Sequence, residues 1–189
     1  MACLALFHSV YGLRPAVRVA ADRFRALGHE VSTPDLYGAP PADTLAAGFA
    51  LADRVGWPAM LDRARHALRG LAPGTVLAGL SMGTGIVHDL LPERPATAGV
   101  LLLSGVGGDF PHVPDGLRAQ LHVADPDEEY APETAVDRFV ARMTAAQANF
   151  EVYRYPGVGH LWTDGGTAGF DRPAADRAWD RCAEFLRLS

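Results

Sequence analysis

The stretch that decides the fold of this chain is Gly-Leu-Ser-Met-Gly at residues 79–83. The apolar run at residues 75–78 before it is typical of a buried strand, and residues 85–91 after it have the pattern of a helix. A serine held on a sharp turn from strand to helix needs glycine on both sides, because a Cβ there would clash. Such a turn lifts the Ser81 hydroxyl clear of the sheet and sets backbone N–H groups beside it, which suits a nucleophile. The alternative is a plain glycine-serine turn in which Ser81 only caps the following helix.

Composition and charge exclude several classes of function. The chain has 189 residues and a formal net charge of −5 without any basic run, so neither nucleic acid nor a membrane is expected as a partner. All 17 basic residues are arginine, which excludes a catalytic lysine and Schiff-base chemistry. Neither a C-x-x-C nor an H-E-x-x-H pattern occurs, so we expect no metal and no cofactor.

The two cysteines and the first seven residues indicate in which cellular compartment the protein is expected. Cys3 and Cys182 lie near opposite ends of the chain, one in a strand pattern and one in a helix pattern. We interpret them as buried thiols rather than a disulfide, which suits a reducing compartment. The apolar start at residues 1–7 has no positively charged leader region and is too short to span a bilayer, so it is interpreted as a strand. A cytoplasmic protein is therefore expected.

Apolar strands alternate with amphipathic helices along the chain. The expected strands are residues 2–7, 29–32, 75–78, 99–103, 120–123 and 150–155, and the expected helices are 15–27, two within 43–70, 85–91, 133–148 and one at the C-terminal end. The helix at 133–148 is expected to bury Val136, Phe139, Val140 and Met143, and the last helix Ala175, Ala178, Trp179, Cys182 and Leu186. This alternation predicts an α/β fold with a mostly parallel sheet of about six strands, helices on both faces, and one domain over residues 1–189.

Functional side chains of an open parallel sheet gather on the loops beyond the carboxyl ends of its strands. One such loop, residues 124–129, carries four acids (Asp125, Asp127, Glu128 and Glu129), one of which is expected to be the acid partner of the serine. Another, residues 156–160, ends in His160, whose imidazole can take the serine proton near neutral pH. The order serine, acid, histidine is the one found in α/β-hydrolases.

Over nearly its whole length the chain resembles the dienelactone hydrolase family of small α/β-hydrolases. The similar stretches are residues 6–13 (Leu-Phe-His-Ser-Val-Tyr-Gly-Leu), 28–31 (Gly-His-Glu-Val), 34–37 (Pro-Asp-Leu-Tyr), 122–127 (His-Val-Ala-Asp-Pro-Asp) and 155–160 (Tyr-Pro-Gly-Val-Gly-His). The resemblance implies a compact α/β-hydrolase fold.

Carried over position by position, the resemblance implies a role for five residues. Ser81 would be the nucleophile, His160 the base and Asp127, rather than Asp125, the acid that orients the imidazole. The backbone N–H groups of Val10 and Met82 would form the oxyanion hole.

Two departures from the family pattern bear on the substrate. The best-known members use a cysteine nucleophile and place a glutamate near the first strand, whereas this chain has Ser81 and, at the position of the glutamate, Ser9. They also hold a carboxylate-bearing substrate with arginines, one of them shortly after the histidine, but residues 161–164 here are Leu-Trp-Thr-Asp. Because Asp164 would repel a carboxylate, a neutral ester is the expected substrate.

The function predicted from these observations is a cofactor-free serine hydrolase that cleaves small, neutral carboxylic esters through an acyl-enzyme. A thioesterase or an acyltransferase would use the same site, and a non-catalytic small-ligand binding protein of the same fold is the alternative from another class. Tyr11 and Trp162 are expected either to line the pocket or to pack in the core. We also expect a small pocket, because no long insertion could form a lid, and a monomer or homodimer.

Overall fold

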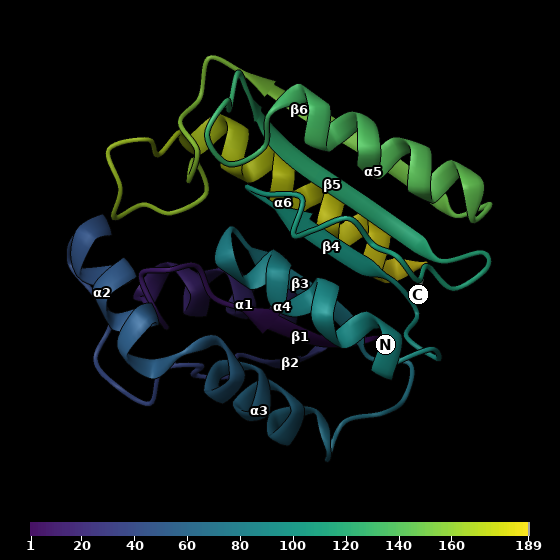
Figure 1. Ribbon diagram of the computed structural model, residues 1–189, viewed down its shortest axis with the longest axis horizontal. Coiled ribbons are helices and arrows are strands. Elements are labelled where there is room, and N and C mark those ends of the chain that lie inside the picture. The colour runs from purple at the N-terminus through teal and green to yellow at the C-terminus, as the bar shows by residue number, and fades with distance from the viewer. Residues whose placement is uncertain (189) are drawn as a thin grey trace.

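The computed structural model, which describes residues 1–188, is built around one six-stranded sheet in which every pairing is parallel (Figure 1). The order of the strands is β2-β1-β3-β4-β5-β6. Their bounds are β1 (Cys3–Phe7), β2 (Glu30–Ser32), β3 (Val76–Leu80), β4 (Val100–Leu103), β5 (Arg118–Asp125) and β6 (Asn149–Pro156). Because all six strands point the same way, the loops that follow them meet at one end of the sheet.

Helices cover both faces of this sheet (Figure 1). They are α1 (Pro15–Ala26), α2 (Leu45–Val55), α3 (Trp57–Leu68), α4 (Met82–Leu90), a 3₁₀ turn η1 (Leu91–Glu93), α5 (Glu133–Ala145) and α6 (Arg172–Arg187). Side chains of α1 and α6 form one apolar cluster with one face of the sheet, and side chains of α2 to α5 form a second cluster with the other. Within residues 1–188 no helix is both long enough and apolar enough to cross a membrane.

The predicted α/β architecture is confirmed, and its elements differ from the expected ones mainly at their ends. The strand expected at 120–123 extends over Arg118–Asp125, and the helix expected to reach residue 148 ends at Ala145. All five apolar residues expected on the inner face of α6 are buried. On α5 the exception is Val140, which is 36% exposed because helical spacing places it at the margin of the buried stripe.

The turn from β3 into α4 depends on two glycines that allow backbones to touch. A Cβ on Gly79 would collide with the backbone of Gly83, the second residue of α4. A Cβ on Gly83 would collide with the carbonyl oxygen of Phe7 and lie 2.9 Å from that of His8, both at the end of β1. Ser81 itself has a φ of 50°, a conformation that costs a non-glycine residue free energy and persists only where its surroundings enforce it. The two glycines therefore let α4 lie close enough to the sheet to hold Ser81 in this conformation.

We predict that Gly83→Ala lowers the free energy of unfolding by about 1–3 kcal/mol, since the new methyl group meets backbone atoms that cannot rotate away. Gly70→Ala is the matched control, because a Cβ there meets nothing within 4 Å and should change stability by less than about 0.5 kcal/mol. Urea denaturation of both variants measures the difference. Equal midpoints for the two variants would show that the approach of α4 to β1 is not tight.

Candidate active site

Ser81 stands at the carboxyl end of β3, where several hydrogen bonds fix its backbone. Its N–H donates to the carbonyl oxygen of Leu103 at the end of β4, at 2.8 Å. Its own carbonyl oxygen accepts from Thr84, through both the backbone N–H at 2.8 Å and the hydroxyl at 2.6 Å. Although Ser81 occupies the N-cap position of α4, its side chain makes no capping hydrogen bond. The capping interpretation of Ser81 is therefore wrong, and the hydroxyl is free to face the pocket.

The structure brings Ser81, His160 and Asp127 together in one hydrogen-bonded chain. Ser81 Oγ lies 2.8 Å from His160 Nε2, and His160 Nδ1 lies 2.6 Å from Asp127 Oδ2. An ionised carboxylate can only accept, so Nδ1 carries the proton and Nε2 is left to accept from the serine hydroxyl. The Asp127 side chain is only 5% exposed and that of His160 is 18% exposed. Limited contact with water strengthens the interaction between the two groups.

Asp125, the alternative acid, does not reach the imidazole. It is the last residue of β5 and is exposed, and its carbonyl oxygen accepts from the N–H of Gly157 at 3.0 Å in the loop after β6. Asp127 comes two residues later, where the chain has left the sheet and can turn toward His160. Glu128 and Glu129 are exposed, and Glu129 hydrogen-bonds to the Tyr130 hydroxyl.

Tyr130 is a site residue that sequence reasoning missed. Its ring lies against the His160 imidazole, with centroids 4.1 Å apart and planes inclined by 31°. Its backbone N–H lies 3.3 Å from Asp127 Oδ1, so the same residue contacts both the acid and the histidine. The hydrogen bond with Glu129 is the main reason that the pKa of Tyr130 is raised to about 12, which keeps the phenol protonated. The only sequence signal was its place just after the acidic loop.

Val10 and Met82, the residues expected to supply the oxyanion hole, both lie at the pocket beside Ser81. Outside the regular helix and strand hydrogen bonds, neither backbone N–H donates to any residue that the structure describes. The Tyr37 hydroxyl fixes both segments, since it lies 2.8 Å from the carbonyl oxygen of Val10 and 3.4 Å from Sδ of Met82. Burial raises the pKa of Tyr37, so this hydroxyl keeps its proton and remains a donor.

His8 anchors the same loop from beneath. The side chain is fully buried, and burial lowers its pKa, so the imidazole is neutral near pH 7. Nδ1 donates to the carbonyl oxygen of Ser9 at 2.7 Å, and Nε2 accepts from the N–H of Leu36 at 3.0 Å. These two bonds tie the loop after β1 to the segment that carries Tyr37.

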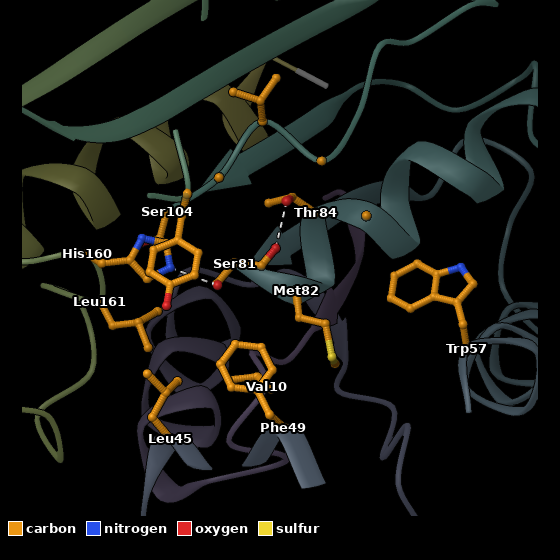
Figure 2. A pocket seen from close by; sticks show the side chains of 15 residues that line it. Val10, Leu45, Phe49, Trp57, Ser81, Met82, Thr84, Ser104, His160 and Leu161 are labelled. Carbon is orange, nitrogen blue, oxygen red and sulfur yellow. Dashed lines mark hydrogen bonds between the residues drawn. The ribbon is translucent and has the colours of Figure 1, made fainter. Parts of the chain in front are cut away.

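A pocket of about 330 Å³ opens beside Ser81 and is mostly apolar (Figure 2). Its walls come from the loop after β1, from α2 and α3, from the start of α4 and from the loops after β4, β5 and β6. No aspartate, glutamate, lysine or arginine is among the residues that line it; the lining side chains beyond Ser81 and His160 include Val10, Leu45, Phe49, Trp57, Met82, Tyr130 and Leu161. Nowhere in residues 1–188 do three or more potential metal-ligating side chains cluster.

Two residues expected either at the pocket wall or in the core lie away from the pocket. Trp162 is fully buried in the apolar cluster of α1 and α6, with its ring 4.9 Å from that of Tyr155, so its expected place in the core is confirmed and its expected place in the pocket is wrong. Tyr11 is not among the pocket-lining residues, and its ring instead lies 4.7 Å from the guanidinium of Arg14. Both residues flank site residues in sequence, but the adjacent backbone turns their side chains away.

Asp164 was also placed wrongly. Its side chain is 11% exposed, lies outside this pocket and pairs with Arg14 at 3.4 Å. The expectation of a neutral substrate therefore depends on the absence of charged side chains that could bind a carboxylate in the pocket, and not on repulsion by Asp164.

The sheet is parallel, Ser81 lies on a tight turn after the central strand β3, and it faces His160 from the loop after the last strand. These features define the α/β-hydrolase class. The model of the dienelactone hydrolase family matches residues 3–188, and the chain belongs to that family. The resemblance noted from the sequence is thereby confirmed, and with it the class of hydrolases that act on ester-like bonds.

Individual relatives are distant in sequence. A protein of Azospirillum brasilense named "Putative carboxymethylenebutenolidase" is 24% identical over 97% of this chain and 86% of its own length. The crystal structure of P91, a dienelactone hydrolase-like promiscuous phosphotriesterase from metagenomic libraries, superposes with a TM-score of 0.77 at 16% identity, covering 100% of this chain and 86% of P91. The Francisella virulence factor BioJ superposes with a TM-score of 0.73 at 10% identity, covering 100% of this chain and 77% of BioJ. At such identities the solved structures show the shared fold.

Tyr37→Phe tests whether the loop after β1 depends on its hydrogen bond to Tyr37. The variant leaves the buried carbonyl oxygen of Val10 without this donor, so we predict a loss of about 1–3 kcal/mol in the free energy of unfolding. Tyr153→Phe is the control: its hydroxyl bonds to the exposed Glu151, and its removal should cost less than about 0.5 kcal/mol. Chemical denaturation measures both, and equal losses would contradict the prediction.

Proposed function

We propose that this protein is a serine hydrolase that cleaves carboxylic esters of small, neutral, largely apolar substrates through an acyl-enzyme. The observation that carries the proposal is the chain of hydrogen bonds from Ser81 through His160 to Asp127, facing a pocket that no aspartate, glutamate, lysine or arginine lines. A neutral serine hydroxyl is a weak nucleophile, and a histidine at hydrogen-bond distance is the base that activates it.

In the proposed acylation step, Ser81 Oγ attacks the ester carbonyl carbon while His160 Nε2 takes the serine proton. The Asp127 carboxylate holds the ring in the required tautomer and stabilises the imidazolium that forms. The negative charge that develops on the carbonyl oxygen is directed at the backbone N–H groups of Val10 and Met82. One such donor is worth about 10²–10³ in rate in enzymes where it has been removed.

Collapse of the tetrahedral intermediate breaks the bond to the alcohol oxygen, and His160 gives its proton to that oxygen as it leaves. A water molecule then enters, His160 takes one of its protons, and the resulting hydroxide attacks the acyl carbon. The second intermediate releases the carboxylic acid and returns the proton to Ser81 Oγ. The cycle uses only groups of this chain and water, so the proposal requires no cofactor.

The pocket favours a neutral substrate, because burying a carboxylate among Leu45, Phe49, Trp57 and Met82 without a cation would be costly. Thioesters and acyl transfer to another acceptor would use the same groups and remain alternatives within this proposal. The two free thiols, Cys3 and Cys182, support a reducing compartment, and we propose the cytoplasm.

The experiment that tests the proposal is intact-mass analysis after exposure to a fluorophosphonate. We expect one label per chain, on the peptide that contains Ser81, and no label on Ser81→Ala. No labelling of folded wild-type protein would overturn the proposal and favour the alternative of a small-ligand binding protein.

The two acids of the loop after β5 supply a matched pair of variants. Asp127→Asn removes the charge that holds the imidazole, so kcat for a p-nitrophenyl ester should fall by about 10³–10⁴. Asp125→Asn changes an exposed side chain and should alter kcat by less than about threefold, because surface groups away from the reacting atoms contribute little. Equal losses in the two variants would contradict the assignment of Asp127.

A further inference from the structure

The pocket extends to one side of Ser81 and ends on the indole of Trp57. Figure 2 shows His160 and Leu161 on one side of Ser81 and Trp57 on the other, with Met82 between. Trp57 is the first residue of α3, whereas the residues around the nucleophile come from α4 and from loops after other strands. The pocket is therefore a trough that runs along the first turn of α4, with a fixed element at its far end.

The length of the trough follows from the helix. Gly85 lies four residues after Ser81 and also lines the pocket. Four residues of α-helix advance by about 6 Å, and residues at this spacing share one face of the helix. A Cβ on Gly85 would come within 2.9 Å of Cη2 of Trp57, so the indole rests directly on the backbone at this position. The Trp57 indole, which forms the end wall of the trough, therefore lies about one helical turn from Ser81.

The position of His160 decides which part of an ester enters the trough. His160 must protonate the alcohol oxygen as it leaves, so the alcohol has to lie on the His160 side of Ser81. The remaining substituent of the carbonyl carbon, the acyl chain, then points away from His160 and toward Trp57. On the alcohol side the pocket is lined by the buried Leu161 and by Leu45 of α2, and Leu45 is 39% exposed.

We propose that the trough is the acyl-binding subsite and that Trp57 sets the longest acyl chain that the protein accepts. This inference rests on the proposed esterase function. It assigns short and medium linear acyl groups as substrates, whereas the alcohol part is only loosely selected.

The wall is held in place by hydrogen bonds outside the pocket. Trp57 Nε1 donates to Asp89 Oδ2 at 2.7 Å, and Asp89 Oδ1 lies 2.8 Å from His88 Nδ1. The His88 ring in turn packs edge-on against Phe110, with centroids 5.0 Å apart. Asp89 acts through Trp57 rather than by touching substrate, so it is a positioning residue for the wall.

The test compares kcat/KM along two series of esters. One series varies the acyl chain from acetate to decanoate on a p-nitrophenyl group, and the other keeps butanoate and varies the alcohol from methyl to octyl. For the wild type we expect kcat/KM to fall once the acyl chain exceeds the trough, and to depend weakly on the alcohol. Trp57→Ala should raise kcat/KM for octanoate relative to acetate by about 10- to 100-fold, and leave the order of the alcohols unchanged.

Two further variants separate the wall from general packing. Trp57→Leu keeps an apolar side chain over α4 but is shorter, and should shift the preference in the same direction even if Trp57→Ala does not fold. Asp89→Leu keeps the indole but removes its anchor, and should broaden the acyl profile mainly through KM, with kcat on acetate nearly unchanged. Trp57→Phe keeps an aromatic wall and is the matched control, with a smaller shift than Trp57→Leu.

Fluorophosphonate labelling of Ser81 in each variant distinguishes the possible failures. If Ser81 is labelled and esters are hydrolysed but the acyl preference is unchanged in Trp57→Leu, the subsite assignment is wrong while the proposed function stands. A shift in the alcohol series instead of the acyl series would also overturn the assignment. If neither the wild type nor any variant is labelled or hydrolyses esters, the proposed function is wrong, and the inference is wrong with it.

Discussion

The contact on which the active centre depends is the approach of the α4 backbone at Gly83 to the end of β1. Only a residue without a Cβ fits against the carbonyl oxygens of Phe7 and His8, and this fit sets how deeply α4 lies on the sheet. The depth of α4 in turn forces Ser81 into its φ of 50°, with the N-terminal turn of the helix directly below the hydroxyl. A helix that stood farther from β1 would separate Met82 from Val10 and relax the turn that presents the serine.

The surroundings of this contact stabilise it through neutral, buried polar groups rather than through charges. His8 and Tyr37 connect the loop after β1 to the segment after β2 and to Met82, and burial keeps both side chains uncharged. Uncharged donors and acceptors avoid the large desolvation cost of buried ions. The one charged group drawn into the site, Asp127, has both oxygens occupied, by His160 and by the N–H of Tyr130.

Periodicity and turn residues allowed most of the sheet to be predicted, because strands such as β3 and β4 are short apolar runs in the sequence. The same local patterns could not show where side chains point once the chain leaves a strand. Trp162 follows His160 by two residues yet packs in the apolar cluster of α1 and α6, away from the pocket. Asp164 pairs with Arg14 rather than entering the pocket. The structure also distinguishes Asp125 from Asp127, because β5 extends two residues farther than its pattern indicated. Trp57 could not be singled out from the sequence, since its place in the pocket depends on contacts with Gly85 and Asp89 from another element.

The order of the strands has a consequence for how the site comes into existence during synthesis. Ser81 follows β3 in the middle of the sheet, whereas His160, the base proposed for it, follows β6 at the sheet edge, 79 residues later in the chain. Ser81 is therefore translated, and its turn can form, long before His160 has been added to the chain. Because β6 pairs only with β5, its docking completes the sheet and the hydrogen-bonded chain in the same event. Under the proposed function, a nascent chain that has not yet added β6 would carry Ser81 without its base, and reactivity toward acyl groups would be a property of the fully assembled sheet.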